Sequence, residues 1–124
     1  MHKYDPERTP DAAQWLALDE QERIVLAKKY HRQARVELPN IELHAIIHAI
    51  VENQIAEGHA PVTRAMSRLT STGLSRHEAI HAVGSVLAEH LFGAFKGDPA
   101  GGNPTAGYDD EVERLTAKSW LRGR

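Results

Sequence analysis

The sequence predicts an all-α protein, a single-domain helical bundle of about five helices. Apolar residues recur at helical spacing through most of the chain, and no segment alternates apolar and polar residues with the period of two that a strand requires. The length of 124 residues suits one domain with one hydrophobic core. We therefore treat 1–124 as one helical domain, in which a flexible Gly- and Pro-rich loop over 97–107 precedes a C-terminal helix.

Two start signals open the first part of the chain. Thr9 followed by Pro10 is typical of an N-cap and a first helical position, and it predicts a short helix. Asp19 and Glu22 have the spacing of a capping box and predict a second helix over about 20–37. The apolar positions of that helix recur every four residues: Leu26, Tyr30 and Ala34.

The middle of the chain predicts the central helix of the fold. Pro39 and Asn40 break the chain and cap a helix over about 41–57, which ends near Gly58. One side of this helix carries both apolar residues and histidines: Ile41, His44, Ile47, His48, Val51 and Ile55. A third helix follows from Pro61 to about residue 72.

A long helix is predicted over about 76–95, opened by Ser75. Its apolar stripe has helical spacing: Ile80, Val83, Leu87, Leu91 and Phe95. Gly84 and Ala88 keep the same side of the helix narrow. After the loop, Tyr108 begins a last helix that extends through Trp120.

Bulk composition excludes several functions. With 15 Lys and Arg against 17 Asp and Glu, the net charge of −2 creates no field that favours nucleic acid or an anionic membrane. The chain has no cysteine, which excludes disulfides, thiolate metal sites and cysteine nucleophiles. The first residues lack the apolar core of a signal peptide, and no later apolar run is long enough to span a bilayer. We expect a cytoplasmic protein without a membrane partner.

The most informative feature is two pairs of histidines spaced four residues apart, His44/His48 and His77/His81. Residues four apart stand on the same face of a helix, so each pair can direct its imidazoles to one point. Two such pairs on facing helices form a transition-metal site, because imidazole is the commonest protein ligand of these ions. Zinc, which prefers a tetrahedral set, is the first choice, and nickel, iron and cobalt also accept imidazole.

The alternative is that these histidines belong to the core or its rim, hydrogen-bonded to carbonyl groups and to one another. That interpretation suits a single histidine on an apolar face. Four together favour a metal, since each unsatisfied buried imidazole would cost about 1–3 kcal/mol. The remaining histidines lack such a partner and are expected to face solvent: His2, His31, His59 and His90.

His77 to His81 also matches H-E-x-x-H, in which two histidines bind zinc and the glutamate activates a metal-bound water. Glu78 is therefore the catalytic candidate of a metal-dependent hydrolase. The likeness to the longer metzincin pattern stops at Leu87, which stands where that pattern has its third histidine. Ser75 and Glu78 also form a capping-box pair, and we favour this role for Glu78.

Glu52 lies one helical turn beyond His48 and is the candidate for an additional carboxylate ligand or for a partner that orients His48. A solvated polar face is its other interpretation. A dinuclear ferritin-like site would need two Glu-x-x-His pairs. Glu78 and His81 supply one, but Ala45 stands at the matching position before His48.

The residues from Pro39 to His81 resemble a family of small bacterial proteins, domain of unknown function 1841. The resemblance rests on the run from Leu43 to His48, on the Glu-Asn-Gln at 52–54, on Pro61 and Arg64, and on His77 to His81. By resemblance, the two histidine pairs and Gln54 are the family-like positions. The family has no established activity, so the resemblance supports the site without implying a reaction.

Three functions remain open at this point. The first is a metal-binding protein in which the ion is structural or sensory, and the second is a metal-dependent hydrolase with Glu78 or Glu52 as base. The third is a helix-turn-helix nucleic-acid binder built from 61–72 and 76–95, which the apolar character of the second helix and the negative net charge disfavour. Trp15 and Trp120 would serve a homodimer contact as well as a local one.

Overall fold

The computed structural model describes residues 3–33, 40–95 and 107–123, and within these ranges every regular element is an α-helix. The predicted all-α class is confirmed. The helices are α1 (Ala12–Ala17), α2 (Glu20–Gln33), α3 (Ile41–Ala56), α4 (Ala60–Ser71), α5 (Arg76–Phe95), α6 (Tyr108–Arg114) and α7 (Ala117–Leu121). The end of the helix predicted over 20–37 and nearly all of the predicted loop lie outside the described residues.

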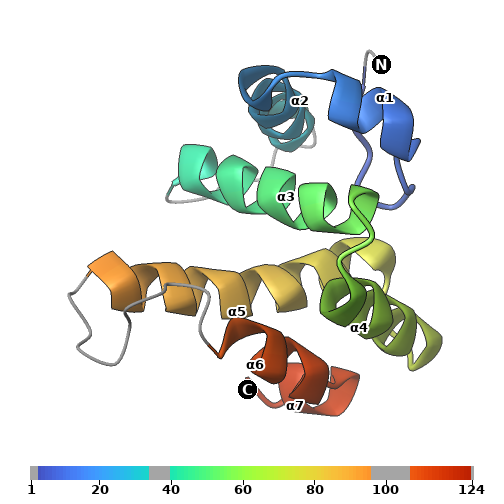
Figure 1. Ribbon diagram of the computed structural model, residues 1–124, viewed down its shortest axis with the longest axis vertical. Coiled ribbons are helices and arrows are strands. Elements are labelled where there is room, and N and C mark those ends of the chain that lie inside the picture. The colour runs from blue at the N-terminus through green and yellow to red at the C-terminus, as the bar shows by residue number, and fades with distance from the viewer. Residues whose placement is uncertain (1–2, 34–39, 96–106, 124) are drawn as a thin grey trace.

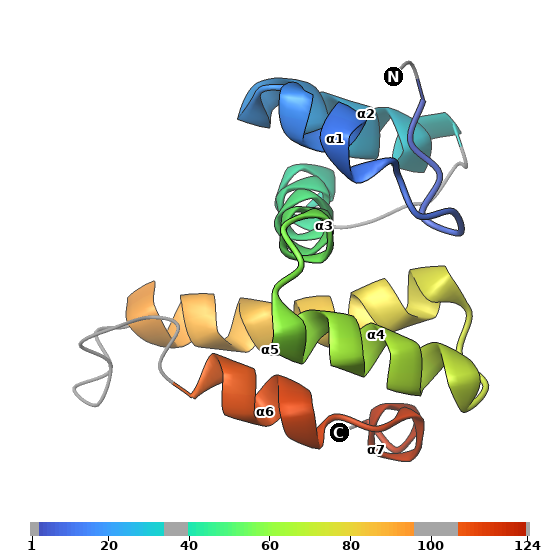
Figure 2. The same cartoon turned by 45° about the vertical axis from the view of Figure 1, so that its right-hand side comes forward.

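The helices stack in layers with α3 in the middle. Figures 1 and 2 show α1 and α2 at one end of the molecule, α3 beneath them, then α5 with α4, and finally α6 and α7. Helix α3 contacts α1 and α2 on one side and α4 and α5 on the other. The prediction that this helix is central is confirmed. None of the helices in the described ranges combines the length and apolar character that a membrane span needs.

The core has one part on each side of α3. The smaller part lies between α3 and the N-terminal layer, around Trp15 and Tyr4, and both side chains are buried. Trp15 also donates from its indole to Asn53 Oδ1 at 2.9 Å, so it belongs to the core of its own chain. The larger part joins α3 to the four helices that follow it. Burial on both sides fixes how α3 is rotated, and this rotation positions its histidines.

The starts of α2, α3 and α5 follow the side-chain caps that the sequence predicts. The Asp19–Glu22 capping box forms, with both side chains bonded to the partner's backbone N–H. Asn40 caps α3 by accepting from Leu43 N at 3.0 Å. The predicted start at Thr9 is wrong, because α1 begins at Ala12 and its N-cap is Asp11. The aspartate carboxylate accepts a hydrogen bond from a free N–H of the first turn, and its negative charge interacts favourably with the positive end of the helix dipole.

The C-terminal helix predicted as continuous is broken into α6 and α7. Leu115 leaves the helical conformation with ψ 131°, and Thr116 then caps α7 through a capping box with Ser119. The guanidinium of Arg68 on α4 donates to the carbonyl oxygens of Val112 and Leu115, each at 2.9 Å. These bonds satisfy carbonyl groups at the end of α6, so the break leaves fewer backbone acceptors unpaired.

Close packing of α3 against α5 requires a glycine at position 84. A Cβ built on Gly84 would lie 2.7 Å from Ile47 Cγ2, which is closer than side chains tolerate. The missing side chain therefore lets the two helices approach. Both histidine pairs are carried by these two helices.

Candidate metal centre

Five histidines gather where three layers of the fold meet. His44 and His48 come from α3, His77 and His81 from α5, and His31 from α2. Each offers one ring nitrogen, and these five nitrogens all lie within 4.8 Å of one another. The structure thus brings together the four histidines singled out by their spacing and adds a fifth. The group is compatible with a metal site.

The expectation that His31 faces solvent is wrong, because its side chain is fully buried. Ile24, Ala27 and His31 form the stripe of α2 that points inward, at intervals of three and four residues. His31 Nδ1 lies 2.7 Å from the carbonyl oxygen of Ala27, to which it can only donate. Neutral His31 therefore presents a bare lone pair at Nε2, and this buried atom has no hydrogen-bond partner within the described residues.

The other histidines lie apart from the cluster. His59 is partly exposed and pairs with Asp109 at 2.8 Å. The expectation that His90 faces solvent is wrong, because its side chain is only 17% exposed and lies 3.2 Å from Glu111. Helix α6 covers this part of α5, which the spacing of α5 alone does not reveal. His2 lies outside the described residues.

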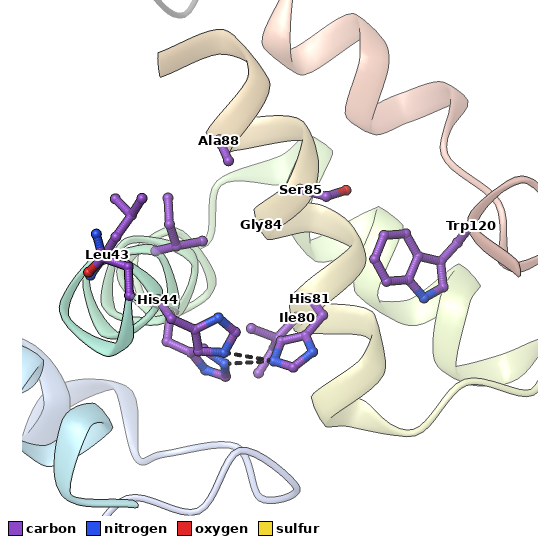
Figure 3. A pocket seen from close by; sticks show the side chains of 11 residues that line it. Leu43, His44, Ile80, His81, Gly84, Ser85, Ala88 and Trp120 are labelled. Carbon is purple, nitrogen blue, oxygen red and sulfur yellow. Dashed lines mark hydrogen bonds between the residues drawn. The ribbon is translucent and has the colours of Figure 1, made fainter. Parts of the chain in front are cut away.

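Nitrogen spacing within the cluster suits ligands of one ion. His81 Nε2 lies 3.1 Å from His44 Nε2 and 3.0 Å from His48 Nε2, and Figure 3 shows the two contacts as dashed lines between α3 and α5. Two nitrogens that bind one ion at ~2.0–2.1 Å lie roughly 2.9–3.4 Å apart for angles of about 90–109° at the ion. The rings therefore already stand at the separation that a shared ion would impose.

Hydrogen bonds behind His48 fix which of its nitrogens faces the cluster. The Tyr4 hydroxyl donates its hydrogen to Glu52 Oε2 at 2.6 Å, so it can only accept from His48 Nδ1 at 3.1 Å. His48 Nδ1 must then carry the ring hydrogen. This leaves a lone pair on Nε2, directed at His81. The Ala27 carbonyl fixes the hydrogen of His31 on Nδ1 in the same way.

Glu52 is buried, with 1% of its surface exposed, so its interpretation as part of a solvated face is wrong. Its carboxylate forms a two-pronged ion pair with the guanidinium of Arg76, at 2.7 and 2.8 Å. Glu52 is absent from the group of five potential ligands and reaches His48 through Tyr4. It therefore supports the orientation of His48 from behind.

The five imidazoles cannot satisfy one another with hydrogen bonds. Each neutral Nε2 holds either one hydrogen or one lone pair in the ring plane. His48 presents a lone pair, so His81 has at most one hydrogen to divide between His48 and His44. The Nε2 atoms of His31 and His77 are buried without any hydrogen-bond partner among the described residues. The cluster therefore leaves ring nitrogens unpaired, at a cost of about 1–3 kcal/mol for each unsatisfied group.

Burial keeps the cluster uncharged at neutral pH. Desolvation and the neighbouring histidines lower the pKa of His44 to about 4 and that of His81 to about 3. The same causes lower the pKa of His48 further, and burial also lowers the pKa of His31 and of His77. Neutral imidazole is the form that binds metals. Protons therefore compete weakly with a metal for these nitrogens at pH 7.

Glu78 lies at the start of α5 in the predicted capping box. Ser75 N donates to Glu78 Oε1 at 3.3 Å, and Glu78 N donates to Ser75 Oγ at 3.1 Å. Its side chain is exposed, and it is absent from the five-histidine group. The capping role is confirmed, and it directs this carboxylate toward the end of the helix.

We expect Glu78→Gln to retain the metal and to lose less than about 1 kcal/mol of unfolding free energy, because a glutamine also reaches the Ser75 N–H. Metal analysis and urea unfolding of the variant would measure both quantities. Glu78→Leu, which cannot form the bond, serves as the matched comparison and should be the less stable of the two. Loss of metal from Glu78→Gln would contradict the capping role and indicate that the carboxylate acts at the ion.

A pocket of about 350 Å³ adjoins the cluster between α3 and α5. His44, His48 and His81 form part of its wall, and Figure 3 shows Trp120 of α7 beyond α5. The remaining lining residues are Asn40, Leu43, Ile47, Ile80, Gly84, Ser85 and Ala88. The cluster is therefore accessible from one side.

No protein-family model matches this chain, and neither a curated protein nor a solved structure matches it. The resemblance to domain of unknown function 1841 therefore stays a prediction. Among its positions, Gln54 lies outside the histidine cluster, where its Oε1 accepts from the Tyr108 hydroxyl at 2.8 Å. This bond ties α3 to α6.

Proposed function

We propose that this protein binds one transition metal ion per chain in the five-histidine cluster, with zinc as the first choice. The observation that carries the proposal is the presence of unpaired buried nitrogens among five ring nitrogens that converge on one place. A metal ion accepts lone pairs from the nitrogens that bind it, so it removes the cost of burying those nitrogens unpaired. Nitrogen separations of 3.0 and 3.1 Å support a single shared ion.

The ion would have a structural or sensory role, since its ligands come from three different helices. A metal at this place links α2, α3 and α5 across the layers, and its binding free energy becomes folding free energy. The hydrolase alternative needs a carboxylate base beside the ion. Glu78 forms the helix cap, and Glu52 forms the ion pair with Arg76. Neither carboxylate therefore supports the hydrolase alternative.

The helix-turn-helix alternative gains no support from the first turn of α5. Its side chains would have to reach the base edges of DNA. Arg76 instead pairs with buried Glu52, and His77 belongs to the cluster. Two side chains that such a helix would present to a groove therefore contribute to the interior.

Purified without chelator, the protein is expected to contain about one transition metal ion per chain, because the cluster offers neutral, prepositioned imidazoles. Mass spectrometric metal analysis of the purified protein would measure the content and identify the ion. Cobalt substitution adds the coordination number, since the visible absorption of cobalt(II) is strong in tetrahedral sites and weak in octahedral ones. A tetrahedral spectrum would favour zinc, which takes four ligands in structural sites.

The matched control for the metal analysis is His59→Ala, which removes a histidine outside the cluster and should leave the content unchanged. The proposal fails if the purified protein lacks stoichiometric metal and added zinc, nickel, iron and cobalt all fail to bind. It also fails if the metal present survives replacement of both His48 and His81.

A further inference from the structure

The pocket beside the cluster has two chemically different parts. Three imidazoles line one part, and the facing walls carry apolar side chains that include Leu43 and Ile47 from α3 and Ala88 from α5. Figure 3 shows Leu43 and Ala88 on opposite sides of this space. None of the described lining residues is an Asp, Glu, Lys or Arg. The volume of about 350 Å³ lies at the lower end of small-molecule sites, roughly 300–1,000 Å³.

Charge distinguishes the pocket side of the cluster from its other side. Three carboxylates interact electrostatically with His77, which does not line the pocket: those of Asp5, Glu7 and Glu78. The carboxylate of Glu52 is neutralised by Arg76. An ion held by neutral imidazoles keeps its positive charge, and none of the described residues that line the pocket carries an acidic side chain to offset it.

We propose that the pocket binds a small apolar carboxylic acid in its ionised form, with the carboxylate on the metal ion and the apolar body between α3 and α5. Oxygen of a carboxylate is a ligand that transition metals accept beside imidazole. The apolar walls near Leu43, Ile47 and Ala88 gain from covering a hydrocarbon body. This inference rests on the proposed metal site, because the ion supplies the positive charge that binds the carboxylate.

The test uses the full chain loaded with cobalt(II), whose visible absorption reports changes at the ion. Hexanoate is the probe, and it is expected to change the spectrum in a saturable way. Acetate, which lacks most of the apolar body, should bind on the order of a hundredfold more weakly, since each buried methylene contributes roughly fourfold. Hexan-1-ol, which has the body without the charge, should leave the spectrum unchanged.

Two variants that narrow the pocket from facing walls test its location. Ala88→Phe and Leu43→Trp should each weaken hexanoate binding by about tenfold or more, while the cobalt content stays at the wild-type level. Ala60→Phe is the control of matched size, because Ala60 is exposed at the start of α4 and does not line the pocket. Its hexanoate affinity should equal that of the wild type.

The outcomes separate this inference from the metal proposal. If cobalt binds but hexanoate leaves the spectrum and the heat of titration unchanged, the inference is wrong and the metal site stands. Equal affinities for acetate and hexanoate would also overturn it, because the apolar walls would then contribute nothing. If the protein binds no metal at all, both proposals fail together.

Discussion

Removing the metal is expected to lower the free energy of unfolding by about 4 kcal/mol, when free metal otherwise exceeds its dissociation constant about a thousandfold. An ion that binds only the folded chain stabilises it by mass action, and here it joins α2, α3 and α5. Thermal unfolding with a chelator, and again after zinc is added back, would measure this difference. The helices should remain folded at low temperature if the core on both sides of α3 suffices without the ion.

Replacing the ligands tests whether they share one ion. His48→Ala and His81→Ala should each reduce the metal-induced rise in melting temperature, and the double variant should abolish it. The two losses should not add, because binding that is already weakened by one change has less to lose from the other. Comparing each variant with and without metal cancels the cost of the cavity that each substitution leaves in the core.

His59→Ala is the control for these variants, since His59 pairs with Asp109 away from the cluster. Its metal-induced shift should equal that of the wild type. Chelation that leaves the wild-type melting curve unmoved would show that the histidines are ordinary core residues. Strictly additive losses in the His48 and His81 variants would indicate that the two side chains act in separate sites.

Local signals account for the parts of the fold that the sequence predicts. Caps such as Asn40 and the Asp19–Glu22 pair act within one helical turn, so neighbouring residues are sufficient to recognise them. The break between α6 and α7 depends instead on Arg68 of α4, far away in the sequence. A continuous helical pattern does not reveal a remote guanidinium that stabilises the interruption.

The same distinction between local and distant contacts explains which residues of the site could be predicted from the sequence. His44 and His48 reveal their common face through spacing alone, and so do His77 and His81. His31 is a single histidine on α2, and whether it points inward depends on which face of α2 meets α3. Tyr4 precedes the first helix and carries no periodic pattern, yet it contacts His48 across 44 residues of sequence. Such contacts are set by the packing of layers and not by local spacing.

The ion pair behind the cluster is expected to be as important for stability as the metal. Arg76→Met should lower the free energy of unfolding by about 3–5 kcal/mol, because it leaves the Glu52 carboxylate buried without a counter-charge. The variant also loses the bonds that Arg76 donates to the Pro6 carbonyl and to Thr9. Urea unfolding in the presence of chelator would measure the loss without any contribution from the metal.

The double variant Glu52→Gln/Arg76→Met distinguishes a buried unpaired charge from lost packing. Removing both charges should restore most of the stability, because well-packed neutral side chains often replace a buried ion pair without loss. The exposed pair Arg64–Glu113 gives the control, since Arg64→Met should cost only about 0–1 kcal/mol. A double variant as unstable as Arg76→Met would mean that the arginine acts through its contacts with the N-terminal segment.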